Sequence, residues 1–217
     1  MGVIPLGSLK SPETGDRLYS FGAISDVHIV YDTAKDDFRR ALRYFKNNQD
    51  IDFICISGDL TDKGTESELT QYTNIITEVQ INKPIYAVAG NHEHYRTTSN
   101  SYLSKYTGHD LCYTINVGDD VFIMVGIASG SKDTKDKEEI FYEGTLQWLY
   151  ETLEANRNKR CFLFEHILYA GGSGDVLGLY PYSKFGQEAE GKEFKNLLKH
   201  YKNVIFFHGH SHMRFSL

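Results

Sequence analysis

The chain has 217 residues, a mass of 24.8 kDa, a formal net charge of −6 and a pI near 5.8. This length suits one domain, since globular domains commonly run to about 200 residues. Lysines and arginines are scattered along the chain, which argues against a dedicated nucleic-acid-binding protein. No apolar stretch approaches the roughly 20 residues that span a bilayer. We therefore expect a soluble protein that acts neither in a membrane nor on duplex nucleic acid.

The cysteines and the N-terminal segment bear on location. Cys55, Cys112 and Cys161 lie inside apolar runs without paired spacing, which predicts free thiols in a reducing compartment. The first nine residues lack the basic start and the longer apolar segment of a secretory signal, so the expected location is cytoplasmic. Residues 1–17 are rich in proline, glycine and serine, which predicts an irregular lead-in, and residues 18–217 are predicted to form the domain.

The first part of the chain alternates apolar runs with helical periodicity. In chain order these segments are residues 18–24, a helical stretch around Phe38, Leu42 and Phe45, residues 51–56, a helical stretch at 69–79, and residues 85–89. Strands that alternate with helices of this length are typical of crossover units, so we predict parallel pairing.

The second part adds an antiparallel element. The segments LCYTINV and VFIMVGI are separated only by residues 118–120, Gly-Asp-Asp, which favours a hairpin and makes the sheet system mixed. A helix at 145–154, a strand at CFLFE, a helix at 194–198 and a final strand at VIFF follow. Residues 129–139 and 171–186 lack a clear period; long loops of this kind are often functional lids.

Five apolar runs are each followed by residues that can bind a metal ion. These residues are Asp26 and His28, Asp59, Asn91 and His92, His166, and His210 and His212. Matching ends of parallel strands lie along one edge of a sheet, so these side chains can converge. In an extended chain residues i and i+2 face the same side, which would point Asp26 with His28, and His210 with His212, at one site. His94 is predicted either to support this site without binding the metal or to face solvent. His208 is predicted to support the site or to lie in the core.

The pattern resembles a known family signature. The matching pieces are Asp26-x-His28, Gly58-Asp59, Gly90-Asn91-His92-Glu93, His166 and Gly209-His210-x-His212, over residues 20–212. Together they resemble the motifs of the calcineurin-like metallophosphoesterases. Residues 144–149, GTLQWL, are similar to the helix that precedes the lone-histidine strand in that family. The resemblance implies an α/β fold, a four-layer αββα sandwich of two mixed β-sheets flanked by helices, with a dinuclear metal centre at the C-terminal ends of strands.

The resemblance also implies roles for individual residues. The first metal would be held by Asp26, His28, Asp59 and His212, and the second by Asp59, Asn91, His166 and His210. Asp59 would bridge the two ions, and His92 would act as general acid or stabilise the transition state. Paired ions about 3.5–4 Å apart generate a bridging hydroxide as nucleophile and clamp the phosphoryl group. Nitrogen and oxygen ligands without thiolate fit manganese, iron or zinc.

The expected function is metal-dependent hydrolysis of phosphodiesters or phosphomonoesters, with a small-molecule phosphate ester or a nucleotide as substrate. One alternative is a catalytically inactive relative that serves as a binding or scaffold module. Another is a single-zinc hydrolase of amide or carboxylic ester bonds, in which a bridge at Asp59 would have no purpose. The chain ends five residues past His212, where the family usually continues into further strands, so either the second sheet is short or the sequence is part of a longer chain.

Overall fold

The computed structural model describes residues 18–96, 100–127, 141–167 and 189–212. The predicted lead-in 1–17 and the predicted loops 129–139 and 171–186 lie outside these ranges. The elements in chain order are β1 (Phe21–Ile24), α1 (Asp32–Asn47), β2 (Phe53–Ser57), α2 (Glu66–Val79), β3 (Ile85–Val88), the short 3-10 helix η2 (His92–His94), α3 (Asn100–Thr107), β4 (Cys112–Val117), β5 (Asp120–Val125), α4 (Thr145–Ala155), β6 (Cys161–Phe164), α5 (Ala189–Lys199) and β7 (Val204–Phe207).

The strands form two sheets. The first has the order β1-β2-β3 with parallel neighbours, and the second has the order β4-β5-β6-β7, in which only β4 runs antiparallel to its neighbour. Val117 pairs with Asp120 across a two-residue turn in which Gly118 has φ of +59°. The predicted hairpin and the predicted parallel crossovers are both confirmed.

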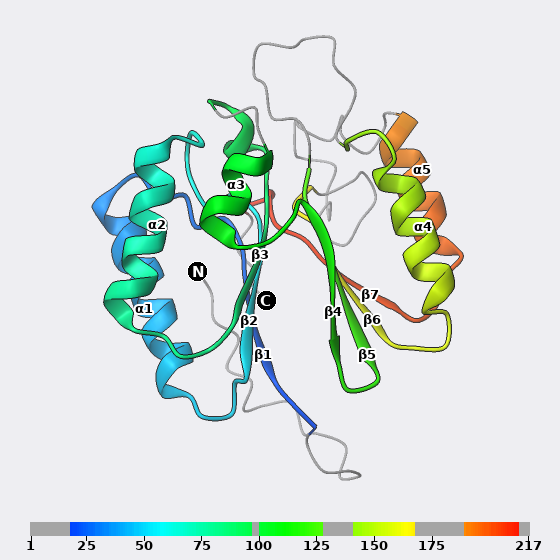
Figure 1. Ribbon diagram of the computed structural model, residues 1–217, viewed down its shortest axis with the longest axis horizontal. Helices are drawn as coiled ribbons and strands as arrows, with labels where there is room; N and C mark the ends of the chain where they lie inside the picture. Colours follow the sequence, from blue (N-terminus) through cyan, green and yellow to red (C-terminus); the bar gives the residue numbers. More distant parts are fainter. Residues whose placement is uncertain (1–17, 97–99, 128–140, 168–188, 213–217) are drawn as a thin grey trace.

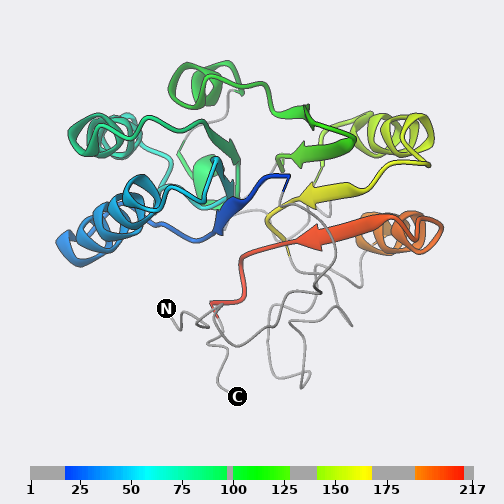
Figure 2. The ribbon, with the colours of Figure 1, turned by 90° about the horizontal axis from the view of Figure 1, so that it is seen from below.

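The two sheets pack face to face, and a pair of helices covers each outer face (Figures 1 and 2). Successive residues of β2 explain the layering, because side chains of a strand alternate between its two faces. Ile54 and Ile56 pack with the buried face of α1 and α2, whereas Phe53 and Cys55 pack with Phe122 of the other sheet. The predicted four-layer sandwich is therefore confirmed. Among the described strands only the second sheet is mixed, whereas the prediction was of two mixed sheets.

The second sheet is covered in the same way. Val121, Ile123 and Val125 of β5 face α4 and α5 and pack with Leu149 and Leu153. Burial on both faces explains why β2 and β5 are apolar except at Ser57, which ends β2, and Asp120, which begins β5. Neither strand shows the polar alternation of a half-exposed strand. The three cysteines are free, as predicted. Among the described helices, none is both long and apolar enough to cross a bilayer.

The loops that follow the strands leave from the C-terminal ends of the strands in both sheets. The register places Ile24 beside Ile56 and Ser57 beside Val88 in the first sheet, and Phe164 beside Phe207 in the second. The loops after these strands therefore leave from the same edge.

The loop after β2 leads into α2, which begins with a capping box. Thr65 Oγ1 accepts a hydrogen bond from the backbone N–H of Glu68, and Glu68 Oε2 accepts from the N–H groups of Thr65 and Lys63, each at 3.1 Å. These bonds satisfy N–H groups that have no partner inside the helix.

Candidate metal centre

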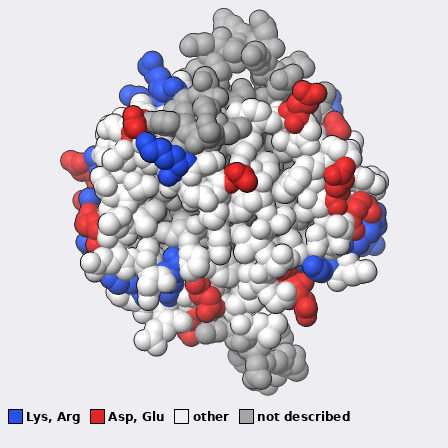
Figure 3. All heavy atoms as spheres, viewed as in Figure 1, with Lys and Arg blue, Asp and Glu red and all other residues white. Residues whose placement is uncertain are grey.

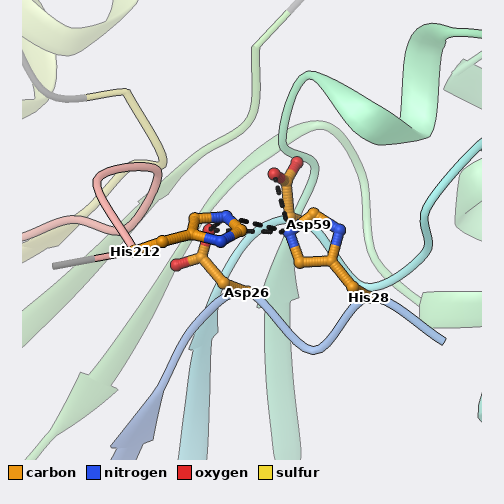
Figure 4. A group of neighbouring side chains, drawn as sticks. All are labelled: Asp26, His28, Asp59 and His212. Atoms are coloured by element: carbon orange, nitrogen blue, oxygen red, sulfur yellow. Dashed lines mark hydrogen bonds and ion pairs between the residues drawn. The ribbon is translucent and has the colours of Figure 1, made fainter. Parts of the chain in front are cut away.

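Four of the predicted side chains meet where β1, β2 and β7 end: Asp26, His28, Asp59 and His212 (Figure 4). His28 Nε2 lies 3.1 Å from His212 Nε2 and 3.5 Å from Asp59 Oδ2, and His212 Nε2 lies 3.1 Å from Asp26 Oδ1. Nitrogen and oxygen atoms of four side chains thus face one small volume. This is the set that the sequence assigns to the first metal.

A second group shares Asp59 with the first. Asp59 Oδ2 lies 3.0 Å from His166 Nε2, and Asp59, His166 and His210 offer atoms within 4.8 Å of one another. Asn91 has its side-chain nitrogen bonded to the Tyr95 hydroxyl at 2.8 Å, while its Oδ1 is buried and accepts no hydrogen bond. Asp59, His166 and His210 belong to the set that the sequence assigns to the second metal.

The two groups suit metal ions for two reasons: the distances between their ligand-type atoms, and the buried polar atoms among them that form no hydrogen bond. Metal–ligand bonds of about 2.0–2.2 Å put neighbouring ligand atoms roughly 3.0–3.6 Å apart, and most of the contacts above fall in or near that range. Asp59 Oδ2 and His166 Nε2 are buried and form no hydrogen bond of normal geometry, although they face each other at 3.0 Å. Buried polar atoms without hydrogen bonds are costly, and a shared cation would satisfy them.

The charges of the two groups are tightly linked. Burial alone would raise the pKa of Asp26 and Asp59, but hydrogen bonds and charge from the surrounding histidines hold both pKa values below the ordinary one. Burial would lower the pKa of His166, yet pairing with Asp59 outweighs it and raises the pKa to about 9. Burial and the charge of His166 lower the pKa of His210 to about 4. A metal ion at this site would compete with a proton for His166 Nε2.

His92 lies beside both groups and has a fixed tautomer. Its Nδ1 lies 2.6 Å from the backbone carbonyl of Asp62, which can only accept, so Nδ1 carries the hydrogen. Nε2 lies 3.9 Å from Asp59 Oδ2. Burial lowers the pKa of His92, partly offset by Asp59 and the Asp62 carbonyl. The neutral ring thus presents a lone pair at Nε2, and only the protonated ring can donate a proton from that atom.

Asp62 is a site residue that the sequence reasoning missed. Besides its carbonyl contact with His92, its Oδ1 lies 3.9 Å from Nδ1 of both His28 and His92. These three side chains form a further group of ligand-type atoms. Because His92 Nδ1 already donates to the carbonyl, we interpret Asp62 as a residue that orients His92. The signal was available in the spacing Gly58-Asp59-x-x-Asp62.

The backbone at the site differs from the extended conformation expected from sequence. Five of the six non-glycine residues with positive φ in the described ranges are Asp26, His28, Asp59, His210 and His212, at φ between 47° and 69°. The reason is that β1 ends at Ile24 and β7 at Phe207, before these residues. The alternation argument for Asp26 with His28, and for His210 with His212, was therefore wrong. Left-handed turns bring the side chains together, and such strain is concentrated at functional sites.

Two glycines allow the loops to approach one another closely. A Cβ atom on Gly90 would lie 2.2 Å from Asp59 Oδ1, and one on Gly209 would lie 1.9 Å from Ser25 Oγ. No side chain fits at such distances, so these positions require glycine for space.

The neighbouring histidines do not join the groups of ligand-type atoms. His208 contacts the ring of Phe206 and its own loop. His94 is buried, with 8% of its surface exposed, and its ring bonds to the backbone of Ile127, where the second sheet ends. Neither histidine belongs to a group of ligand-type atoms, and the burial of His94 is at odds with the solvent-facing alternative.

The left-handed backbone makes a testable prediction for His28. In the metal-free protein, His28→Gly should be more stable than His28→Ala by about 1 kcal/mol. In the folded state glycine avoids about 1–2 kcal/mol of left-handed strain. Its more flexible unfolded chain lowers the free energy of unfolding by about 0.4–1 kcal/mol. Urea unfolding of the two variants measures the difference.

The same pair of substitutions at Asn91 is the control. Asn91 has φ of −70° and ψ of −28°, an ordinary right-handed conformation, so the order should reverse and Asn91→Ala should be the more stable variant. The same order at both positions would contradict the strain assigned to His28.

Comparison with known proteins agrees with this geometry. The family model described as calcineurin-like phosphoesterase matches residues 19–214. The chain belongs to this family. The clustered aspartates and histidines of the site are groups that could hold the metal ions typical of this family.

The chain is also similar to a curated protein. The chain is 24% identical over 169 residues to a protein of Colwellia psychrerythraea (strain 34H) named as a probable cyclic nucleotide phosphodiesterase. The match covers 77% of this chain and 60% of that relative. This calcineurin-like phosphoesterase therefore spans well under the full length of the relative it matches.

Proposed function

We propose that the protein hydrolyses small phosphodiesters with a dinuclear metal centre. Asp26, His28, Asp59 and His212 would hold one ion, and Asp59, Asn91, His166 and His210 the other. The observation that carries the proposal is that Asp59 belongs to two separate groups of ligand-type atoms. A bridging carboxylate is the feature that a two-metal site needs and a single-metal site does not.

The chain's own residues would divide the chemistry between them. Two bound ions would activate water and polarise the phosphoryl group. The protonated ring of His92 would donate from Nε2 to the leaving-group oxygen, while the Asp62 carbonyl keeps the hydrogen on Nδ1 and the ring in place. No side chain is required as nucleophile.

The comparison with the relative supports a small, nucleotide-like substrate, and the charge of the protein does not oppose one. The relative of 24% identity is named for cyclic nucleotides, which makes a cyclic phosphodiester the first candidate to test. Acidic and basic side chains are interspersed on the face of Figure 3, and the chain is acidic overall. A local positive charge from two dications facing two carboxylates would still attract a phosphate ester.

The direct test is turnover by the metal-loaded protein. Protein loaded separately with manganese, zinc or iron should hydrolyse bis(p-nitrophenyl) phosphate and a cyclic nucleotide faster than p-nitrophenyl phosphate, with about two metal ions per chain by elemental analysis. Failure to hydrolyse any of the three would contradict the proposal. One tightly bound zinc ion would favour the single-metal alternative, and substoichiometric metal would favour a binding module.

A further inference from the structure

Glu93 follows His92 and is the most deeply enclosed acid near the site, with 0% of its surface exposed. Both of its carboxylate oxygens accept hydrogen bonds. Oε1 accepts from the backbone N–H and the hydroxyl of Thr61, each at 2.8 Å, and Oε2 accepts from the backbone N–H of Gly90 at 2.7 Å. The side chain therefore spans two chain segments.

The direction of each bond is fixed by chemistry. Backbone N–H groups can only donate, and the Thr61 hydroxyl accepts from the N–H of Gly64 at 3.0 Å, which leaves its hydrogen for Glu93. Each oxygen of Glu93 thus faces at least one obligatory donor. A glutamine at this position would have to point its NH₂ group at a backbone N–H in either orientation.

The two segments that Glu93 joins are the loops of the candidate metal centre. Thr61 lies between Asp59 and Asp62 in the loop after β2, and Gly90 directly precedes Asn91 and His92 in the loop after β3. The pairing of β2 with β3 ends at Ser57 and Val88. Beyond that point, the buried side chain of Glu93 connects the two loops.

The burial of Glu93 is not explained by an ion pair. No described lysine or arginine lies within 4 Å of it. An ionised carboxylate without a cation is costly to bury unless hydrogen bonds satisfy it. The contacts that offset this cost are those that join the two loops.

We propose that Glu93 is a positioning residue that fixes the separation of the loops after β2 and β3, and so sets Asn91 and His92 against Asp59. This inference rests on the proposed function. Glu93 does not reach substrate or metal in this role, because both oxygens are engaged. It acts through Thr61 and Gly90. One direct bond also joins the same two loops, from the His92 N–H to Asp59 Oδ1 at 3.0 Å.

The chain contains a matched control in Glu68. This buried acid, 6% exposed, also accepts from two backbone N–H groups and one threonine hydroxyl, those of Lys63 and Thr65, but through Oε2 alone. Glu68→Gln can keep its carbonyl oxygen in that place, whereas Glu93→Gln cannot satisfy both loops. The same substitution is therefore expected to be tolerated at one site and damaging at the other.

The experiment compares wild type, Glu93→Gln and Glu68→Gln by hydrogen exchange and by manganese titration. In the metal-free proteins, Glu93→Gln should speed amide exchange in peptides covering Thr61 and Gly90, while Glu68→Gln leaves the Gly90 peptide unchanged. Manganese affinity should fall about 10–100-fold in Glu93→Gln, the usual effect of losing a residue that orients ligands, and change little in Glu68→Gln.

The readouts separate this inference from the proposed function. Unchanged exchange at Thr61 and Gly90 in Glu93→Gln, or equal losses of manganese affinity in the two variants, would overturn the role of Glu93. Wild-type protein that neither binds manganese nor cleaves phosphate esters would instead refute the proposed function, while the exchange data still test the link between the loops. If Glu93→Gln does not fold, Thr61→Val decides. It removes the hydroxyl bond to Glu93, together with the acceptor for the Gly64 N–H, and should show the same effects with a smaller loss of affinity.

Discussion

Asp59→Asn should reduce metal content from about two ions per chain to below one, with kcat/KM lower by at least about 10³-fold. Asparagine keeps the shape of the side chain and tolerates the left-handed φ of 52° at this position. The asparagine oxygen can still accept the hydrogen bond that the His92 N–H donates to Asp59 Oδ1 at 3.0 Å. What disappears is the negative charge shared by both groups of ligand-type atoms. A metal ion contributes several kcal/mol to the transition state, and each 1.36 kcal/mol is tenfold in rate.

Asp120→Asn is the control for this substitution. Asp120 is also buried, at 7% exposed, but it begins β5 at the opposite edge of the sheet, where it pairs with Arg160 and Tyr19. Elemental analysis should find the same metal content in Asp120→Asn as in wild type. Two ions retained in Asp59→Asn would show that the carboxylate does not bridge them, and one ion retained with full activity would favour a single-metal mechanism.

The fold could be predicted from the sequence because the apolar runs mark the strands and the helical periodicity marks the helices between them. The hairpin at Gly118, the crossovers and the four layers all follow from apolar runs that are bounded by turns and separated by helical periodicity. The helix α3 (Asn100–Thr107) and the full length of α5 (Ala189–Lys199) were not predicted. Both have only a few apolar positions at helical spacing, so the periodicity that identified the other helices was weak.

The site was harder to predict because its geometry depends on contacts between loops. The sequence brought Asp26, Asp59, His166 and His210 to one edge through the ends of parallel strands, which is topology. The sequence could not predict the left-handed turns. They lie in loops that bond to one another, for example through the Asp26 N–H and the Gly58 carbonyl at 3.1 Å. The role of Asp62 depends on its backbone carbonyl, and the role of Glu93 depends on buried backbone N–H groups. Such backbone groups occur in nearly every residue, so the sequence does not show where they are used.

His92→Ala should lower kcat by about 10²- to 10⁴-fold, the usual contribution of a general acid, and leave two metal ions bound. Alanine keeps the backbone N–H that donates to Asp59, and the ring belongs to neither group that shares Asp59. His200→Ala, a change of an exposed histidine at the end of α5, should leave both kcat and metal content unchanged. Loss of metal in His92→Ala would mean that the ring is a ligand.

The dependence of kcat on pH distinguishes a proton-donating His92 from a His92 that transfers no proton. With the hydrogen held on Nδ1 by the Asp62 carbonyl, Nε2 can donate only when the ring is protonated. Burial lowers the pKa of His92, so the acid form is lost as pH rises through that value, and kcat of the wild type should fall on the alkaline side. His92→Ala should lack this alkaline limb, because the group that loses the proton is gone. An unchanged limb in His92→Ala would assign the limb to another group and leave His92 with electrostatic stabilisation alone, since a ring that does not transfer a proton can still place charge beside the phosphoryl oxygens.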